Sequence, residues 1–413
     1  MENRQPEKLF NRNSLFLIFG NVLSKFGDVL FSIAVGFYVY DVTNSEALMG
    51  VFTSITMFVT MFVSPFSGAI VDRLNRKLII CGMDILRGIL MVVVGFLCVK
   101  SLLPLELLFA LTILIALSTV LFQPAASTIL IDVVPKTEYV RASSINSSFN
   151  GVVDLISKGF SGILLVVFGV GPLLIFNGIF FLVSAVCLYF IDVPKTLKEG
   201  SKINLLIIIN DIKEGFLALI KTKGLNAFFL LAILINLCSA GYLNLLLLVA
   251  NEKGFSLQQY GLLMSMLSLG SLIGALPTSL LKIKAEHRPW IMIIGFLLGQ
   301  LFTIVGLASL NFLIVIIGLF IGGFTNTVGN LVLNSTIFIM IPIEKRATIL
   351  GFISSSGMGG FALSTLVYGI LAESISISLL AIIGTALGTL FILPLFFNKH
   401  LIKAVIDSGK SVI

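Results

Sequence analysis

The sequence predicts an all-α membrane protein with twelve transmembrane helices, and three observations lead to this class. Of the 413 residues, 57% are hydrophobic and 11% are charged, whereas a soluble domain carries about 25% charged residues. Apolar stretches follow one another almost from end to end, each near the roughly 20 residues that a bilayer requires. Short polar breaks separate them, as in a chain that crosses a membrane repeatedly.

Each apolar run between two polar breaks defines one expected helix. The expected helices cover residues 14 to 40, 47 to 70, 78 to 99, 105 to 130, 143 to 168, 171 to 191, 226 to 250, 258 to 281, 289 to 308, 311 to 339, 348 to 371 and 377 to 397. The first run is too long for a signal-peptide core and lacks a cleavage site of small residues, so we expect it to stay in the protein as the first helix.

One long polar segment divides the chain into two halves of six helices. We predict an N-terminal six-helix bundle over 1–191, a cytoplasmic loop with an amphipathic helix over 192–225, and a C-terminal bundle with a tail over 226–413. MGVFTSITMFVTMFVSPFSGAIVDRLNRK in the first half resembles YGLLMSMLSLGSLIGALPTSLLKIKAEHR in the second. This internal repeat indicates two pseudo-symmetric bundles.

The distribution of positive charge predicts the orientation of the chain. Of the 27 Lys and Arg residues, 22 lie in the N-terminal segment, the even-numbered connections or the C-terminal tail. Only Lys100 and Lys253 lie in odd-numbered connections. Because positive loops stay in the cytoplasm, both termini are expected there. Membrane topology thus explains the net charge of +7, and nucleic acid is not an expected partner.

Few residues in the chain are able to support enzyme or cofactor chemistry. The four cysteines lie in apolar spans without metal-ligand spacing, and His287 and His400 both lie at helix ends. The tail sequence Asp407-Ser408-Gly409-Lys410-Ser411 has Ala404 where a phosphate-binding loop needs Gly. We therefore expect no enzyme activity, no metal and no cofactor.

The most specific motif lies between the second and third predicted helices, Gly68-Ala69-Ile70-Val71-Asp72-Arg73-Leu74-Asn75-Arg76-Lys77. It resembles the signature loop of the major facilitator superfamily, with Asn75 in place of the usual Gly. Asn tolerates a left-handed backbone, so the turn is expected to be kept.

The resemblance implies a conformational-switch loop, in which acid and arginine hold the two halves in the outward-facing state. Its members here are Gly68, Asp72, Arg73, Arg76 and Lys77, with Asp132 as the second acid at the end of the fourth helix. The alternative is a positive inner loop that only sets topology.

Further along the chain, the resemblance narrows to the branch of macrolide and other drug exporters and related siderophore exporters. It rests on Gly27-Asp28, Thr43-Asn44-Ser45, Asp84 with Arg87, Phe122-Gln123-Pro124-Ala125, Lys213-Glu214-Gly215 and Tyr260-Gly261-Leu262. The fifth helix departs from exporters of the superfamily, because Lys158-Gly159-Phe160-Ser161-Gly162 lacks their Gly-Pro, a motif associated with antiport.

Charges inside the spans occur in pairs at helical spacing. The pairs are Lys25 with Asp28, Asp84 with Arg87, and Asp154 with Lys158. Each pair is able to neutralise itself on one helix face, which helps the helix insert. Asp28 and Asp154 lie mid-span on helices that face the central cavity in the resembled fold. They are our proton-coupling candidates, with Lys25 and Lys158 as charge partners.

The second half has no mid-span acid but carries a stripe of amides on the tenth helix. Asn326, Asn330 and Asn334 recur every four residues and share one face. They either hydrogen-bond substrate in the cavity or join helices within the bundle.

These features together predict a secondary transporter that works by alternating access in a bacterial cytoplasmic membrane. Proton-coupled efflux of small amphipathic, drug-like or macrolide-like molecules is the first hypothesis, and the 35 Phe residues favour such substrates. Lipid or nutrient transport on the same fold and a non-transporting sensor or scaffold are the alternatives. The expected partners are substrate, protons and the bilayer, and the chain is expected to be a monomer.

Overall fold

The computed structural model describes residues 10–71, 74–135, 139–192, 225–280, 284–341 and 346–394, with five single residues at 213, 217, 220, 402 and 406. Most of the predicted central loop, including its amphipathic helix, lies outside the described residues. So do Asp72 and Arg73 of the signature loop.

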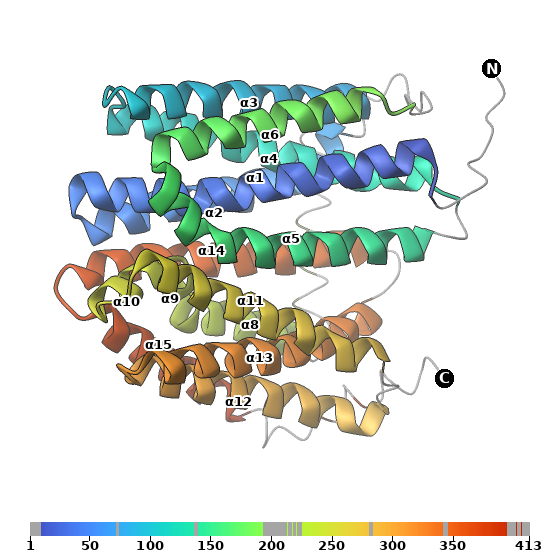
Figure 1. The fold of residues 1–413 in the computed structure, drawn as a ribbon. Helices are drawn as coiled ribbons and strands as arrows, with labels where there is room; N and C mark the ends of the chain where they lie inside the picture. The colour runs from blue at the N-terminus through green and yellow to red at the C-terminus, as the bar shows by residue number, and fades with distance from the viewer. Residues whose placement is uncertain are drawn as a thin grey trace. The chain divides into compact units, whose positions relative to one another are not determined.

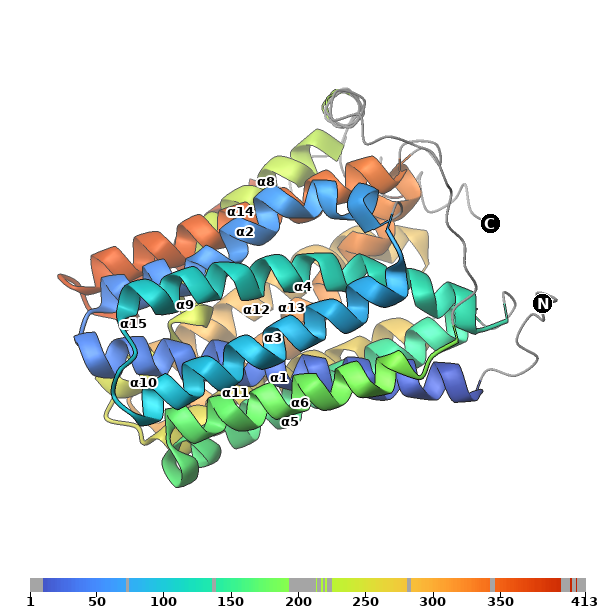
Figure 2. The same ribbon diagram turned by 90° about the horizontal axis from the view of Figure 1, so that it is seen from above.

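The described chain divides into two compact units. Unit 1 comprises residues 1–42 and 59–208, and unit 2 comprises 43–58 and 209–413. The first part of α2 therefore groups with unit 2 and its second part with unit 1. Within each unit the long helices run roughly alongside one another (Figure 1 and Figure 2).

The helices of the first half correspond one by one to the first six predicted spans. They are α1 (Arg12–Thr43), α2 (Glu46–Val71), α3 (Arg76–Val99), α4 (Leu105–Val133), α5 (Tyr139–Phe168) and α6 (Val170–Tyr189). The second half contains α8 (Leu225–Ser239), α9 (Gly241–Asn244), α10 (Leu246–Glu252), α11 (Leu257–Leu280), η2 (Ala285–His287), α12 (Arg288–Ala308), α13 (Phe312–Met340), α14 (Arg346–Ala372) and α15 (Ile377–Ile392).

The length and composition of these helices confirm a membrane protein with an all-helical fold. Among the described residues, ten helices are long and apolar enough to cross a bilayer. Two shorter apolar helices, Phe229–Ser239 and Ile377–Ile392, lie at the remaining two predicted spans. All twelve predicted positions thus hold apolar helix.

The seventh predicted span, 226 to 250, is wrong in one respect, because it is three short helices rather than one. At the first break, the Gly241 N–H donates to Ser364 Oγ at 2.9 Å, and Tyr368 Oη donates to the Cys238 carbonyl at 2.5 Å. The accepting side chain, Ser364, and the donating side chain, Tyr368, both belong to α14. Backbone groups inside a membrane protein must be satisfied, and α14 supplies the partners that the interrupted helix lacks.

Close helix packing in both units depends on glycine. In unit 1, a Cβ on Gly95 of α3 would lie 2.7 Å from the Gly171 carbonyl oxygen of α6. In unit 2, a Cβ on Gly270 of α11 would lie 2.1 Å from the Phe320 carbonyl oxygen of α13. Only residues without a side chain allow backbones to approach so closely, as is common between membrane helices.

The turn before α3 corrects the role expected for Asn75. Its φ is −68°, so the backbone is not left-handed, and its side chain accepts hydrogen bonds from the Lys77 and Leu78 N–H groups. Asn75 is therefore the N-cap of α3, a position where Asn is favoured. Among the described residues, Asn44 is the Asn with a left-handed backbone, with φ 49°, in the turn between α1 and α2.

Two neighbouring charges tie helix ends together in unit 2. The Glu252 carboxylate accepts hydrogen bonds from Ser376 Oγ and from the Ser378 N–H, at the start of α15. The Lys253 ammonium donates to the Leu307 and Ser309 carbonyls, both at 2.7 Å, at the end of α12. Each charge has the sign that complements the helix end it contacts.

Candidate functional site

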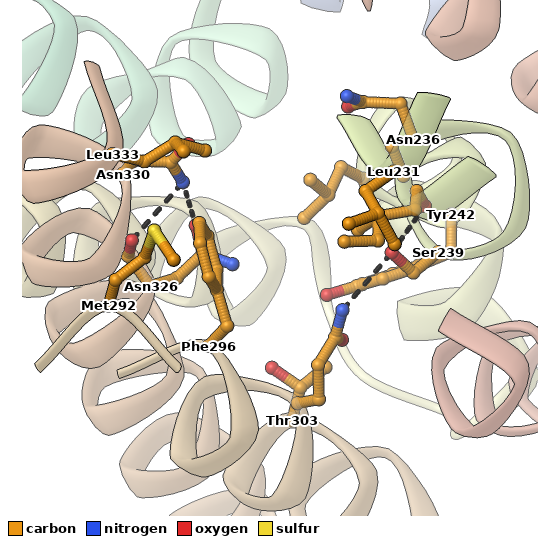
Figure 3. A pocket seen from close by; sticks show the side chains of 14 residues that line it. Leu231, Asn236, Ser239, Tyr242, Met292, Phe296, Thr303, Asn326, Asn330 and Leu333 are labelled. Atoms are coloured by element: carbon orange, nitrogen blue, oxygen red, sulfur yellow. Dashed lines mark hydrogen bonds between the residues drawn. The ribbon is translucent and has the colours of Figure 1, made fainter. Parts of the chain in front are cut away.

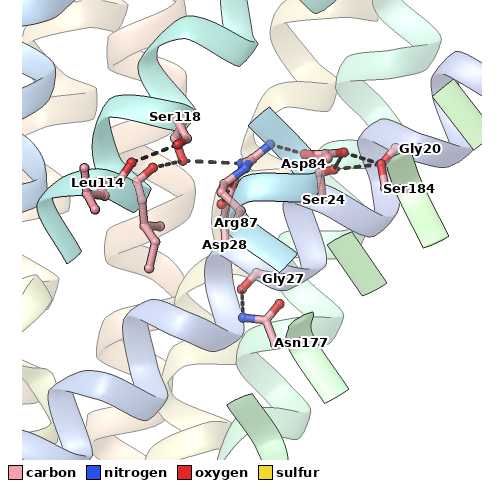
Figure 4. Close-up of polar contacts among 12 residues, drawn as sticks. Gly20, Ser24, Gly27, Asp28, Asp84, Arg87, Leu114, Ser118, Asn177 and Ser184 are labelled. Atoms are coloured by element: carbon pink, nitrogen blue, oxygen red, sulfur yellow. Dashed lines mark hydrogen bonds and ion pairs between the residues drawn. The ribbon is translucent and has the colours of Figure 1, made fainter. Parts of the chain in front are cut away.

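The strongest polar cluster of unit 1 lies between α1, α3, α4 and α6 and is centred on Arg87. The guanidinium is fully buried and pairs with Asp84 on its own helix and, at 3.1 Å, with Asp28 on α1. Its Nη1 also donates to Thr119 Oγ1 at 3.3 Å. One side chain thus connects three helices (Figure 4).

The other side of this cluster is closed by hydroxyl groups. Ser24 Oγ and Ser184 Oγ donate to Asp84 Oδ2 at 2.7 and 2.6 Å. Asp84 is completely buried, and the two serines satisfy its Oδ2 while Arg87 contacts its Oδ1. Figure 4 shows Ser24 and Ser184 gathered on this side of Asp84, with Asp28 near the Arg87 end.

Two aromatic rings enclose the Arg87 guanidinium. Its Cζ lies 4.6 Å from the centroid of Phe122 and 4.5 Å from that of Phe181. A cation over an aromatic face gains electrostatic stabilisation, most of all where water is excluded. The rings and carboxylates together account for a fully buried cation among apolar helices.

The structure corrects the pairing expected for Asp28. Sequence spacing placed Asp28 with Lys25, but its ion-pair partner is Arg87, and Lys25 acts on it only as a nearby charge. Arg87 pairs with a carboxylate on another helix as well as with one on its own, because its guanidinium group has several N–H donors and bonds two carboxylates at once. Asp28 is also the accessible end of the cluster, since 22% of its side chain is exposed and none of Arg87 or Asp84 is.

The pair expected between Asp154 and Lys158 is present, and Arg76 and Asp132, two residues named for the switch loop, also contact each other. Lys158 Nζ lies 2.7 Å from Asp154 Oδ2 on α5, and both side chains are over a quarter exposed. Arg76 Nη1 lies 3.0 Å from Asp132 Oδ2, which joins the start of α3 to the end of α4. Lys77 lies over the ring of Tyr189. Gly68 lies in α2, and Asp72 and Arg73 lie outside the described residues.

A cavity of about 190 Å³ opens within unit 2. Fourteen residues line it: Leu231, Ile235, Asn236, Ser239, Ala240, Tyr242, Leu243, Met292, Phe296, Gln300, Thr303, Asn326, Asn330 and Leu333. They come from α8, α9, α12 and α13, including both sides of the first break in the seventh span (Figure 3). An interrupted helix beside a cavity is the usual setting for irregular backbone at membrane depth.

The predicted asparagine stripe divides at this cavity. Asn326 and Asn330 line it, and Asn330 Nδ2 donates to Asn326 Oδ1 at 2.5 Å. Asn334 is exposed and does not belong to the lining. The remaining polar groups were missed from sequence. Gln300 of α12 donates to Ser239 at 3.2 Å, and the glycine at 241 was the one signal of the nearby break.

Comparison with known families agrees with this architecture. The sequence model of the Major Facilitator Superfamily matches residues 17–245 and 228–405, most of the chain. The chain belongs to the major facilitator superfamily. The resemblance drawn from the signature loop is thereby confirmed, and members of this superfamily are transporters rather than enzymes.

Individual relatives in the superfamily are distant. YkuC, an uncharacterised MFS-type transporter of Bacillus subtilis, is 22% identical over 311 residues, which cover 73% of this chain and 72% of YkuC. Macrolide efflux protein A of Streptococcus pyogenes is 20% identical over 220 residues, 52% of this chain and 53% of that protein. The chain thus aligns with about half the length of the macrolide exporter.

Solved structures share the fold. A point mutant of the nucleoside transporter NupG superposes with a TM-score of 0.75 at 13% identity, covering 94% of this chain and 99% of NupG. A POT family transporter in complex with a thioalcohol-conjugated peptide gives 0.74 at 16% identity, covering 96% and 99%. At these identities the likeness concerns the fold alone.

Proposed function

We propose that the chain is a proton-coupled exporter of small amphipathic molecules in a bacterial cytoplasmic membrane, working as a monomer by alternating access with both termini in the cytoplasm. Its superfamily supports transport, and its similarity to a macrolide efflux protein supports export. A proton moving down its gradient biases such a carrier only if the two states differ in their affinity for it.

Asp28 is the proposed proton-coupling residue, and one observation carries this choice. It is the accessible end of a cluster whose other charged members are fully buried. Water can therefore deliver a proton to Asp28, whereas Asp84 has no exposed surface and is enclosed by two serines and Arg87. Asp154, beside Lys158 on α5, is the second candidate.

The contacts of Arg87 suggest how protonation alters helix packing. A proton on Asp28 neutralises the acceptor that Arg87 Nη1 contacts at 3.1 Å and weakens the ion pair between α1 and α3. Arg87 keeps Asp84 and Thr119 as partners, so it stays in place while α1 loses a link. The Arg76–Asp132 pair joins α3 to α4 in the same unit and belongs to the proposed conformational switch with Gly68, Asp72, Arg73 and Lys77.

The first test measures accumulation of ethidium and of erythromycin in bacterial cells that express the chain, with and without a proton uncoupler. The proposal expects lower accumulation of at least one compound, and expects the uncoupler to abolish the difference. Equal accumulation in expressing and empty cells for both compounds would count against efflux.

The second test replaces Asp28 by Asn, which keeps the shape and an oxygen acceptor for Arg87 but cannot exchange a proton. Uncoupler-sensitive efflux should fall at least tenfold at unchanged protein level. Asp41→Asn is the matched control, because Asp41 is an exposed residue on the same helix. Full proton-driven efflux by D28N would overturn the assignment and move attention to Asp154.

A lipid or nutrient carrier is the second candidate. The fifth helix lacks the Gly-Pro associated with antiport, and the cavity of unit 2 has no charged lining residue. Under this hypothesis, ethidium and erythromycin accumulate equally with and without the chain, and D28N leaves uptake of the natural substrate unchanged.

A further inference from the structure

The cavity of unit 2 combines hydrogen-bonding groups with complete absence of charge in its lining. Among its fourteen lining residues, four are carboxamides, three are hydroxyl-bearing and none is ionisable as an acid or base near neutral pH. The carboxamides are Asn236, Gln300, Asn326 and Asn330, and the hydroxyl groups belong to Ser239, Tyr242 and Thr303.

The orientation of two amides leaves both a donor and an acceptor for a ligand. Asn330 Nδ2 donates to the Asn326 backbone carbonyl and to Asn326 Oδ1. Among the hydrogen bonds of the described residues, Asn326 Nδ2 and Asn330 Oδ1 have no partner. A hydroxyl group both donates and accepts, so a ligand with several hydroxyl groups can accept from the first amide and donate to the second.

The rest of the lining provides an apolar surface beside these amides. Phe296 and Met292 of α12 lie next to Asn326 and Asn330 in Figure 3, and Leu231 lies with Asn236 on the opposite side. Such a lining suits a ligand with polar edges and apolar faces. A charged group would lose its hydration here without gaining a counter-ion, which is costly.

We propose that this cavity binds an uncharged, hydroxyl-rich group such as a sugar or polyol, attached to an apolar portion of the same molecule. The proposal rests on the proposed function, since it names the chemical class of substrate that the carrier takes. It assigns recognition to Asn326 and Asn330, and proton coupling stays with Asp28 in unit 1.

The test measures binding by calorimetry to the purified full chain in lipid nanodiscs, with no transport involved. Three probes share one aromatic ring: phenyl β-glucoside, phenyl phosphate and benzyltrimethylammonium. The proposal expects saturable binding of the glucoside at least tenfold tighter than of either ion. Equal binding of all three, or tighter binding of an ion, would overturn it.

Variants test the two asparagines directly. The double variant Asn326→Leu with Asn330→Leu should weaken glucoside binding at least tenfold, whereas Asn334→Leu, on the same helix but outside the lining, should leave it unchanged. Unaltered binding by the double variant would refute the assignment.

A second variant keeps the test decisive if the double variant fails to fold. Asn330 is exposed, so Asn330→Asp changes charge without new burial and should weaken the glucoside while strengthening benzyltrimethylammonium. An unchanged order of affinities in N330D would refute the proposal. The two proposals fail separately, because binding in nanodiscs needs no proton gradient and D28N efflux needs no knowledge of the ligand.

Discussion

The two units place polar side chains among apolar helices in different ways. In unit 1, two carboxylates and one guanidinium are packed against rings and serines, and Arg87 and Asp84 are sealed from water. In unit 2, neutral amides and hydroxyls line a cavity. A buried charge must keep every partner, whereas a neutral amide at a cavity can exchange partners at small cost. The first arrangement suits a fixed charge network and the second suits a changing ligand.

The largest predicted effect follows from removing the central cation of unit 1. Arg87→Met leaves the Asp84 carboxylate buried without its ion-pair partner, so the free energy of unfolding should fall by about 3 to 5 kcal/mol. Thermal unfolding of the detergent-solubilised protein measures this. Adding Asp84→Asn to the same variant should recover part of the loss, because the uncompensated charge is then gone.

If R87M lowered the free energy of unfolding less than Gln300→Met in unit 2 does, the comparison between the two units would be wrong. Gln300 donates one neutral hydrogen bond, to Ser239 at 3.2 Å. Its loss should cost only about 0.5 to 1.5 kcal/mol.

Two serine variants, one in each unit, test the comparison with an effect of intermediate size on stability. Ser184→Ala removes a 2.6 Å hydrogen bond to the Asp84 carboxylate, and bonds to charged groups contribute about 1.5 to 3 kcal/mol. Ser239→Ala removes the acceptor of the neutral Gln300 bond, which contributes about 0.5 to 1.5 kcal/mol. Melting curves recorded side by side should place S184A below S239A, and the reverse order would contradict the argument.

Sequence patterns predicted the fold well because membrane helices depend on local composition. The twelve apolar runs gave helices at all twelve positions, and Lys158 pairs with Asp154 at the i, i+4 spacing that was read directly from sequence. The Arg76–Asp132 pair also formed, and the family resemblance had implied both residues.

Contacts between helices were harder to predict. The bond from Arg87 to Asp28 joins residues 59 positions apart, and nothing in spacing favours it over Lys25. The break beside the cavity likewise involves Ser364 and Tyr368 of α14, which bond to the Gly241 N–H and the Cys238 carbonyl. Such contacts follow from tertiary packing, so local periodicity alone does not contain them.

The smallest predicted effect concerns a charge of unit 2 outside the candidate spans, the Glu252 carboxylate, and its contribution to stability. Glu252 lies at the end of α10, outside the candidate spans, and is exposed. Burial acts to raise its pKa, but hydrogen bonds from Ser376 and Ser378 outweigh this effect, so the pKa of Glu252 lies below its usual value of 4.5. A lowered pKa stabilises the fold above the unfolded value, and this stabilisation is lost as the pH falls through the folded value.

Glu252→Gln resembles the protonated carboxyl group: it keeps one carbonyl oxygen as an acceptor and replaces the second oxygen by a donor, so it removes the charge and one of the two hydrogen bonds at the start of α15. At about pH 7 the variant should be less stable by about 0.3 to 1 kcal/mol, the usual size of a charge at a helix end. At a pH well below the folded pKa of Glu252 the wild-type carboxylate is protonated, and the two melting temperatures should converge. An equal difference in melting temperature between wild type and variant at both pH values would show that Glu252 acts through its shape rather than its charge.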